Sequence, residues 1–306
     1  MGRVLSRVGV RVGIEDVAGT YQAPTDIVKV ESVVLPNVEF DVVEIPNFSF
    51  FGGTSDVVTI ADWGRANIEI QTSLYKSLSF YDKLLQICNL KKEAVTGGYK
   101  FTPDTHSNTT ASIDLVLTDR KFKIKGAKST FAMSGTVGDR IQVTFGTQGS
   151  YEERVIAPQT LVDSPSDEIL VIRRLGGFTL NGVNLNLSEF NFQMGNELNY
   201  EKFVNIGEVH MSDYNPTISL TMRLEDGGDD GFDAFKNGDI SEFVADIKDV
   251  DGNIVWQLKI PRAKVSAQPA FADSEGIFVI TQEYKALSND GDDNFEINYF
   301  EPVVQP

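Results

Sequence analysis

This chain has few cysteine and histidine side chains, the ones that bind zinc and most often serve as nucleophile or base. Among 306 residues there is one cysteine, Cys88, and there are two histidines, His106 and His210. A zinc site normally takes four cysteine or histidine ligands, so this supply argues against one. A single cysteine also excludes a disulfide within the chain. Because Cys88 lies at helical spacing from other apolar residues, we expect a buried structural thiol and not a nucleophile.

The best candidate for a cation site is segment 249–253, which reads Asp-Val-Asp-Gly-Asn. A calcium loop of the EF-hand type needs glycine at its sixth position and glutamate at its twelfth. Here those positions are Ile254 and Ile260, so the segment predicts a hairpin turn. The acidic stretches 226–230 and 289–294 are interpreted as solvated loops, and weak cation binding there stays open.

Sequence motifs of catalysis are missing from the chain. There is no Walker loop, no Gly-x-Ser-x-Gly elbow and no His-Glu-x-x-His. The 44 acidic residues make a glycosidase-type carboxylate pair conceivable, but nothing singles out two of them. We therefore expect no enzyme, no cofactor and no metal.

Charge is distributed unevenly along the chain. The net charge of -17 divides into -1 for residues 1–160 and -16 for residues 161–306. An acidic half has no electrostatic means of binding a phosphate backbone. It either favours solubility or provides a surface that faces DNA without adsorbing it.

Apolar residues form no run of about 18, so no transmembrane helix is expected. The first residues lack the apolar core of a signal peptide, which predicts folding in a cytoplasm.

The elements that position these residues are mainly strands. Apolar residues alternate with polar ones in several segments, which is the pattern of half-buried strands in antiparallel sheets. The alternating sets are Val38, Phe40, Val42; Ala66, Ile68, Ile70, Thr72, Leu74; and Ile218, Leu220, Met222, Leu224.

One segment, 79–90, has helical periodicity instead. Ser79 is the predicted N-cap, and Asn89 can adopt the left-handed conformation that ends a helix. We expect this short helix to cover one face of a sheet. The residues at helical spacing are Phe80, Leu84, Ile87 and Cys88.

An internal repeat divides the chain. With a shift of 136 residues, 121–128 lies over 257–264 with four identities. Without a gap, Ile141 and Val143 then fall on Ile277 and Val279. The alternative is chance similarity between two hairpins. The predicted repeat core residues are Phe122, Ile124, Leu258 and Ile260.

A linker is predicted at 157–168, which is rich in proline and small polar residues. The expected organisation is an N-terminal arm (1–27), a first β domain (28–156), this linker, and a second, acidic β domain (169–306). Segment 231–244 is the candidate for the second domain's helix, although Gly238 interrupts its pattern.

Several short motifs follow one another along the chain. They are Gly13-x-Glu15 with Gly19-Thr20 and Ala23-Pro24-Thr25, Leu84-Leu85-x-x-Cys88, 99–103, a turn at 126–130, Gly195-Asn196 and Asn215-Pro216-Thr217. In this order they resemble the tail tube proteins of long-tailed bacteriophages. Asn89 and Ser129 stand where that family often has glycine.

The resemblance implies tandem antiparallel β-sandwich or barrel domains, each flanked by a short helix. It also implies rings whose N-terminal arm and long hairpin loop, here 47–56, contact the next ring. The alternative for the phenylalanines of this loop is that they fill the domain's own core. The candidate inter-ring residues are Gly13, Glu15, Gly19, Thr20, Tyr21, Pro24, Phe48, Phe50 and Phe51.

The expected function is structural. Stacked rings would form the tail tube of a virion, a conduit for DNA ejection, after folding in the host cytoplasm. A duplicated chain favours trimeric, pseudo-hexameric rings over hexamers, with other tail proteins as further partners. DNA would pass an acidic lumen without specific binding.

Two alternatives remain. One is another tail or baseplate protein of the same fold. The other is a β-sandwich carbohydrate-binding or adhesin module, which would expose aromatic platforms on a concave face. The chain has only two tryptophans, Trp63 and Trp256, and each lies beside a strand pattern that could bury it.

Overall fold

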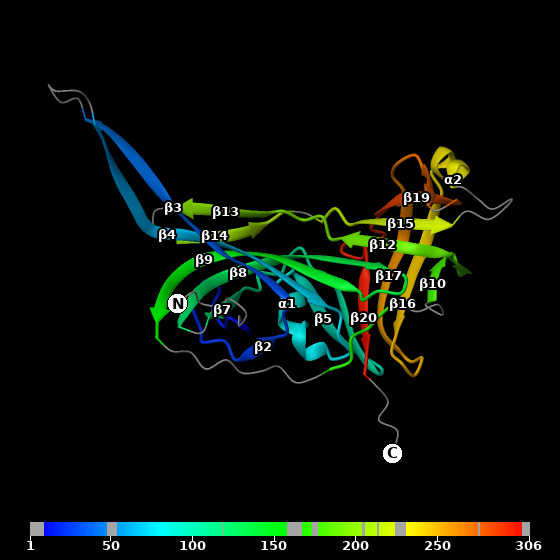
Figure 1. Ribbon diagram of the computed structural model, residues 1–306, viewed down its shortest axis with the longest axis horizontal. Helices are drawn as coiled ribbons and strands as arrows, with labels where there is room; N and C mark the ends of the chain where they lie inside the picture. The colour runs from blue at the N-terminus through cyan, green and yellow to red at the C-terminus, as the bar shows by residue number, and fades with distance from the viewer. Residues whose placement is uncertain are drawn as a thin grey trace, which may run out of the picture.

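A computed structural model describes residues 9–47, 54–117, 119–157, 167–172, 177–203, 206–212, 214–223, 231–274 and 276–301. These residues form antiparallel strands with a few short helices, which confirms the prediction of a mainly β protein. A long two-stranded arm extends from a body of packed sheets (Figure 1).

The elements of the first half end at residue 156. They are β1 (Gly9–Ile14), β2 (Asp26–Val28), β3 (Ser32–Asn47), β4 (Thr54–Ser73), η1 (Leu78–Phe80), α1 (Asp82–Gln86), β5 (Leu90–Val95), β6 (Gly98–Pro103), β7 (Ala111–Leu117), β8 (Arg120–Thr136) and β9 (Gln142–Ile156).

The elements of the second half follow. They are β10 (Gly177–Leu180), β11 (Val183–Asn184), β12 (Leu187–Gln193), β13 (Leu198–Phe203), β14 (Ile206–Met211), β15 (Thr217–Arg223), α2 (Phe232–Asn237), β16 (Ile240–Lys248), β17 (Ile254–Val265), β18 (Ala270–Ser274), β19 (Ile277–Ala286) and β20 (Glu296–Phe300).

Two runs of paired strands cross from one half to the other. The first runs β3–β4–β9–β8–β12–β15–β19–β18, because β12 pairs with the end of β8. The second runs β5–β6–β20–β17–β16–β10, because β20 pairs with both β6 and β17. We call the first run the long sheet. The two halves are therefore joined by backbone hydrogen bonds at two places.

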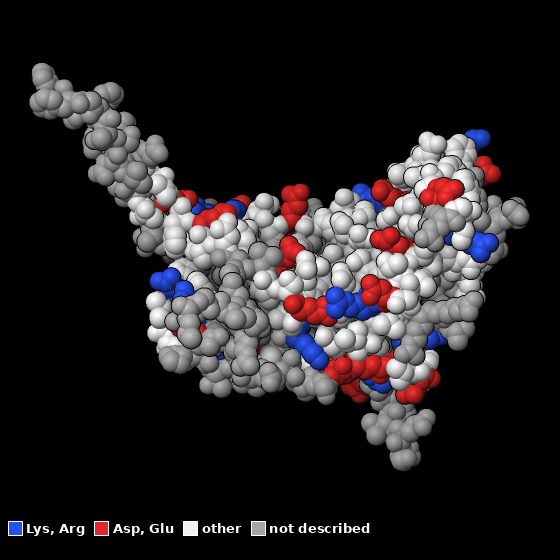
Figure 2. Space-filling view, viewed as in Figure 1, with Lys and Arg blue, Asp and Glu red and all other residues white. Residues whose placement is uncertain are grey.

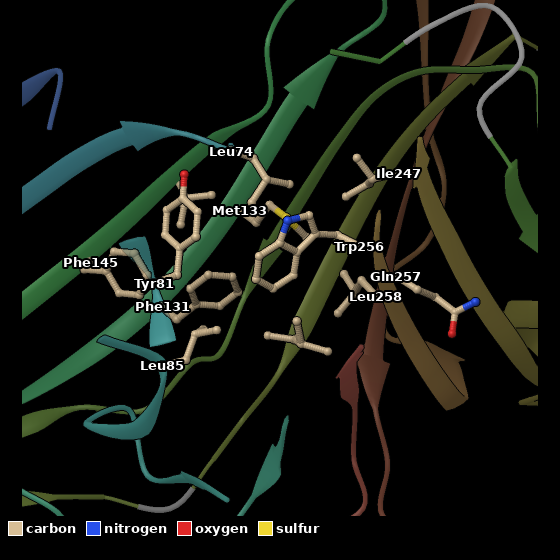
Figure 3. Close-up of a pocket in the computed structure, with 12 residues that line it drawn as sticks. Leu74, Tyr81, Leu85, Phe131, Met133, Phe145, Ile247, Trp256, Gln257 and Leu258 are labelled. Atoms are coloured by element: carbon tan, nitrogen blue, oxygen red, sulfur yellow. The ribbon is translucent and has the colours of Figure 1, made fainter. Parts of the chain in front are cut away.

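The core is also shared between the halves. Trp256 of β17 packs edge-on against Tyr81, with ring centroids 5.8 Å apart, and against Tyr299 at 4.9 Å. Figure 3 shows its indole pointing between Leu74 and Met133 of the first half. Only a small apolar cavity of about 20 Å³ remains there, so the seam between the halves is packed like a protein interior.

The predicted helix is present but shorter. A 3-10 turn, η1, precedes α1, and Ser77 accepts the capping hydrogen bond from the backbone N–H of Ser79. The prediction of Ser79 as N-cap was therefore wrong, because the helical segment begins earlier. Asn89 ends the segment with φ of 56°, which confirms the left-handed conformation. Cys88 is fully buried, donates to the Leu84 carbonyl, and burial raises the pKa of its thiol.

The two halves repeat the same strand order. The sequence β1, β3, β4, α1, β7, β8, β9 corresponds to β10, β12, β15, α2, β16, β17, β19, with the same neighbours paired. A β-bulge also recurs. The register shifts between Ala111 and Ile113 in the first half and between Ser241 and Phe243 in the second.

The partners across the two bulges are the predicted repeat residues. Ile124 pairs with Ile113, and Ile260 pairs with Phe243. Ile124, Leu258 and Ile260 are buried, whereas Phe122 is half-buried.

The ungapped extension of the repeat was wrong. Ile141 and Val143 are buried, but Ile277 is 45% exposed and Val279 is only partly buried. The buried positions of β19 are Ile280, Gln282, Tyr284 and Ala286, because a shift of one residue moves every side chain to the other face.

The domain boundaries stay a prediction, and linker residues 158–166 lie outside the described residues. The second helix exists as α2 but is shorter than the candidate segment 231–244. Gly238, with φ of 71°, ends it, and Ile240 already begins strand β16. Unlike α1, helix α2 buries none of its own residues, and Phe232 and Phe235 are exposed.

Candidate assembly surfaces

The N-terminal segment is bound to its own chain through Glu15. This carboxylate is 7% exposed and accepts hydrogen bonds from the hydroxyls of Thr110 and Ser112 and from the backbone N–H groups of Gly19 and Gly126. Strand β1 before it pairs with β7 along its whole length. Glu15 therefore fixes the loop that follows β1.

The other candidate contact residues of the arm lie around this loop. A Cβ on Gly13 would approach Pro24 at 3.1 Å, so the two pack closely. The hydroxyl of Tyr21 donates to Asp114 at 2.7 Å, and burial and this bond raise the pKa of Tyr21. Gly19 and Thr20 are exposed. Their contact with another ring stays a prediction.

The strands β3 and β4 form the long hairpin expected around 47–56. Pairing between β4 and β9 stops at Arg65. From there toward the tip of the hairpin, β3 and β4 pair only with each other among the described residues. Val42 and Val43 are 56% and 46% exposed, although neighbouring residues of a strand face opposite sides. Both faces of the arm are thus open. Phe48, Phe50 and Phe51 lie outside the described residues, as does the side chain of Trp63.

A second long hairpin, β13–β14, occupies the corresponding place in the second half, between β12 and β15. It lies over β8 and β9 (Figure 1). Ser150 of β9 lies 3.0 Å from the Tyr200 hydroxyl and donates to the Gly207 carbonyl at 2.8 Å. Lys202 forms an ion pair with Asp41 of the arm at 2.6 Å. The base of the arm is therefore braced by the second half.

Two strand edges of the long sheet are open within the described part of the chain. At one end β3 pairs with β4 alone, and at the other β18 pairs with β19 alone. Phe271 of β18 and Phe278 of β19 stack with centroids 5.6 Å apart and are 46% and 51% exposed. Open edges and exposed aromatic pairs are typical of surfaces that bind another strand.

The face of the long sheet turned away from the core is polar. Its side chains are mostly hydroxyls and amides, with acidic and basic side chains among them. Representative residues are Asn67, Gln71, Gln142, Thr144, Thr130, Ser134, Asn191, Gln193, Ser219 and Thr221. Figure 2 shows acidic and basic residues side by side on the face of the molecule turned to the viewer.

Segment 249–253 is the predicted hairpin turn. The carboxylate of Asp249 accepts from the backbone N–H groups of Asp251 and Asn253 and from Lys76 at 2.7 Å. Burial alone would raise the pKa of Asp249, but these bonds hold it below its ordinary value, and the same contact raises the pKa of Lys76. Within the described residues, no group of three or more acidic, cysteine or histidine side chains is arranged to hold a metal.

The remaining acidic and histidine candidates have local roles. In loop 289–294, Asp293 accepts from the backbone of Asn289, and Asp292 accepts from Thr105. His106 and His210 are exposed, and His210 lies 3.1 Å from Glu208. Stretch 226–230 lies outside the described residues.

Comparison with protein families agrees with this geometry. The model of a family described as phage tail tube protein matches residues 6–286. The chain belongs to the phage tail tube protein family. A comparison with curated proteins gave no match. The protein is thus a structural component of the phage tail. No helix in the described ranges is long and apolar enough to cross a membrane.

Two motifs of this tail tube protein have clear structural reasons. Gly195 has φ of 67°, and a Cβ there would lie 2.1 Å from the carbonyl oxygen of Asn215, so the two sequence landmarks lie against each other. Segment 126–130 was predicted to be a turn, which was wrong. It lies inside β8, where Gly126 (φ 59°) sits at a bulge that keeps the strand continuous.

Two features of these surfaces were not predicted. The pairing of β12 with β8 and the exposed Phe271–Phe278 pair both depend on strands distant in sequence. The only available signal was the alternating pattern, which shows that a strand exists but does not give its partner.

Proposed function

We propose that this tail tube protein forms trimeric, pseudo-hexameric rings that stack into the hollow tube of a phage tail. The observation that carries the proposal is the recurrence of one strand order, with its bulge, in both halves. Inside one chain, the first copy already contacts the second edge to edge through β8 and β12. A ring of three chains would present this relationship six times.

Stacking would use the two long hairpins. The arm β3–β4 leaves the body and exposes Val42 and Val43 on opposite faces, which suits insertion between subunits of a neighbouring ring. A head-to-tail contact of this kind does not close, so it produces an extended tube. The exposed loop of Gly19 and Thr20 is the second proposed contact.

The polar face of the long sheet is the proposed lining of the lumen. α1 covers the opposite face with Leu84 and Leu85, so the two faces differ sharply in character. The expected excess of acidic over basic side chains in the lumen stays a prediction, since this face carries charges of both signs. Its many neutral hydroxyl and amide groups give DNA few cationic sites to bind, because affinity for phosphate backbones comes chiefly from lysine and arginine. DNA would then pass during ejection without adsorbing.

Native mass measurement and electron microscopy of the purified protein at high concentration test this function. We expect particles of three times the 33.8 kDa chain mass, and hollow tubes whose cross-sections have threefold symmetry and approximate sixfold symmetry. A ring of six whole chains would contradict the trimer. A protein that stays monomeric at every concentration would contradict the tube and favour another tail or baseplate role.

A further inference from the structure

We infer that the open edge of β18 in one chain receives β3 of a second chain, and that this contact repeats the pairing of β8 with β12 inside the chain. The inference rests on the proposed ring. It goes further by naming the two strands, their register and the side chains that the contact buries.

The register follows from matching rows of paired residues across the long sheet. In the first half, Ala132, Thr144, Gln71 and Ser32 are paired in one row. In the second half, the corresponding row is Ala270, Thr281, Thr221 and Glu189.

A second pair of rows gives the same match. Lys128, Gln148, Asn67 and Asn37 correspond to Lys264, Lys285, Thr217 and Gln193, in agreement with the sequence repeat. Thus β18 corresponds to the end of β8, and β3 corresponds to β12.

The junction within the chain then serves as the template. There, Gln193 pairs with Ala132 and Glu189 pairs with Thr136, antiparallel. Asn37 is the counterpart of Gln193, and Ala270 is the counterpart of Ala132. The template therefore predicts that Asn37 of one chain pairs with Ala270 of the next. Both residues are exposed in the single chain.

Burial supports the same template. Phe271 corresponds to Met133, which is 4% exposed and pairs with Phe192 of β12. Phe278 corresponds to Ile141, which is fully buried. Phe271 and Phe278 face the core side of their strands, yet about half of each is exposed. Met133 is covered where β12 of the second half pairs with β8, so we take the missing cover of Phe271 to be the corresponding strand of a second chain.

Cysteine cross-linking tests the register. In the full-length chain, Asn37→Cys with Ala270→Cys forms disulfide-linked oligomers under mild oxidation if the strands pair as inferred. The matched control is Gln193→Cys with Ala132→Cys, which occupies the equivalent positions and gives a bridge within one chain. Cys88 is fully buried and contributes no background. A third variant, Asn37→Cys alone, reports random collision.

The outcomes separate this inference from the proposed function. If rings form but the double variant links no better than Asn37→Cys alone, the inference fails and the ring proposal stands. If no rings form in any variant, the ring proposal itself fails.

A second test uses the aromatic pair. Phe271→Ser raises the concentration needed for assembly by about three- to tenfold, because only the 46% of the side chain that is exposed in the single chain is left to bury at the contact. Circular dichroism of the variant checks that it still folds, since the other half of the side chain packs within the chain. The control is Phe235→Ser on α2, another exposed phenylalanine, which leaves the assembly concentration unchanged. Equal effects of both substitutions would overturn the inference.

Discussion

The indole N–H of Trp256 donates a hydrogen bond of 3.0 Å to the carbonyl oxygen of Tyr75, across the boundary between the two halves of the chain. The Tyr75 backbone N–H in turn donates to the hydroxyl of Tyr81, whose ring packs against the same indole. These two hydrogen bonds and the ring contact fix the position of the indole at the seam between the two halves. These contacts hold the two halves of the chain against each other.

Replacing Trp256 with alanine should cost about 3–5 kcal/mol of unfolding free energy, the usual range for a fully packed tryptophan. Because the seam belongs to both halves, we expect one cooperative transition in the wild type. In the variant, the two halves should separate into two transitions. Urea unfolding followed by circular dichroism measures this, with exposed Val183→Ala as the control. A single unshifted transition in Trp256→Ala would contradict a structural role for the seam.

The ion pair of Lys76 with Asp249 should make stability depend on pH in the acid range. The hydrogen bonds from Lys76 and Asn253 lower the pKa of Asp249. The stability that this carboxylate contributes is therefore present above about pH 4 and is lost as the pH falls through the folded-state pKa. Asp249→Ala should cost about 1–3 kcal/mol at pH 7, since two backbone N–H groups lose their acceptor.

Thermal melts between pH 3 and pH 7 test this linkage. Asp249→Asn should flatten the acid part of the stability profile, whereas Asp251→Asn, an exposed carboxylate on the same turn, should leave it unchanged. The pKa of Lys76 is raised, so its contribution to stability is present at pH values below the ordinary lysine pKa. It is lost only as the pH rises through the raised pKa, in strong alkali. Identical acid profiles for both asparagine variants would refute the assignment.

Glu15→Gln should loosen the loop that follows β1. The carboxylate accepts from four donors, and an amide would place an N–H group against two of them. We expect a cost of about 1–3 kcal/mol and faster hydrogen exchange at Gly19 and Gly126. Asp16→Asn, at an exposed neighbour, is the control. Unchanged exchange at both glycines would show that the loop is held by other contacts.

Gly98→Ala should release the last strand from the first half. A Cβ at this position would lie 1.9 Å from the carbonyl oxygen of Tyr299, a clash that only separation of β6 and β20 relieves. Gly97→Ala has open space around it and serves as the control for glycine loss, although its φ of 84° carries its own strain. Hydrogen exchange of β20 should rise in Gly98→Ala and remain slow in Gly97→Ala.

Lysine on the polar face of the long sheet should slow the passage of DNA. We expect phage carrying Ser219→Lys and Asn191→Lys to eject DNA more slowly at low salt, with recovery at high salt, because phosphate contacts weaken as salt rises. The control is Ser266→Lys, which adds the same charge on the loop between β17 and β18, away from the polar face. Equal rates in both variants would show that this face does not line the lumen.

Local patterns predicted the individual elements well. Alternation at Ile68 and Ile70 predicted a strand with one buried face, and Asn89 predicted the helix end, because both depend on neighbours within a few residues. The repeat at Ile124 and Ile260 was detected for the same reason. The register of β19 was predicted wrongly. One additional residue in the preceding segment shifts the strand by one position, and the alternation of apolar and polar residues looks the same before and after such a shift.

The sequence by itself therefore determined the mainly β class, the buried thiol of Cys88, the turn at 249–253 and the similarity of the two halves. Only the tertiary structure decided which strands meet, as β12 does with β8, and which aromatic residues remain uncovered, as Phe271 does. The physical reason is that backbone hydrogen bonds between strands are nearly independent of sequence. An open edge and its partner can be recognised only after the chain has brought distant segments together.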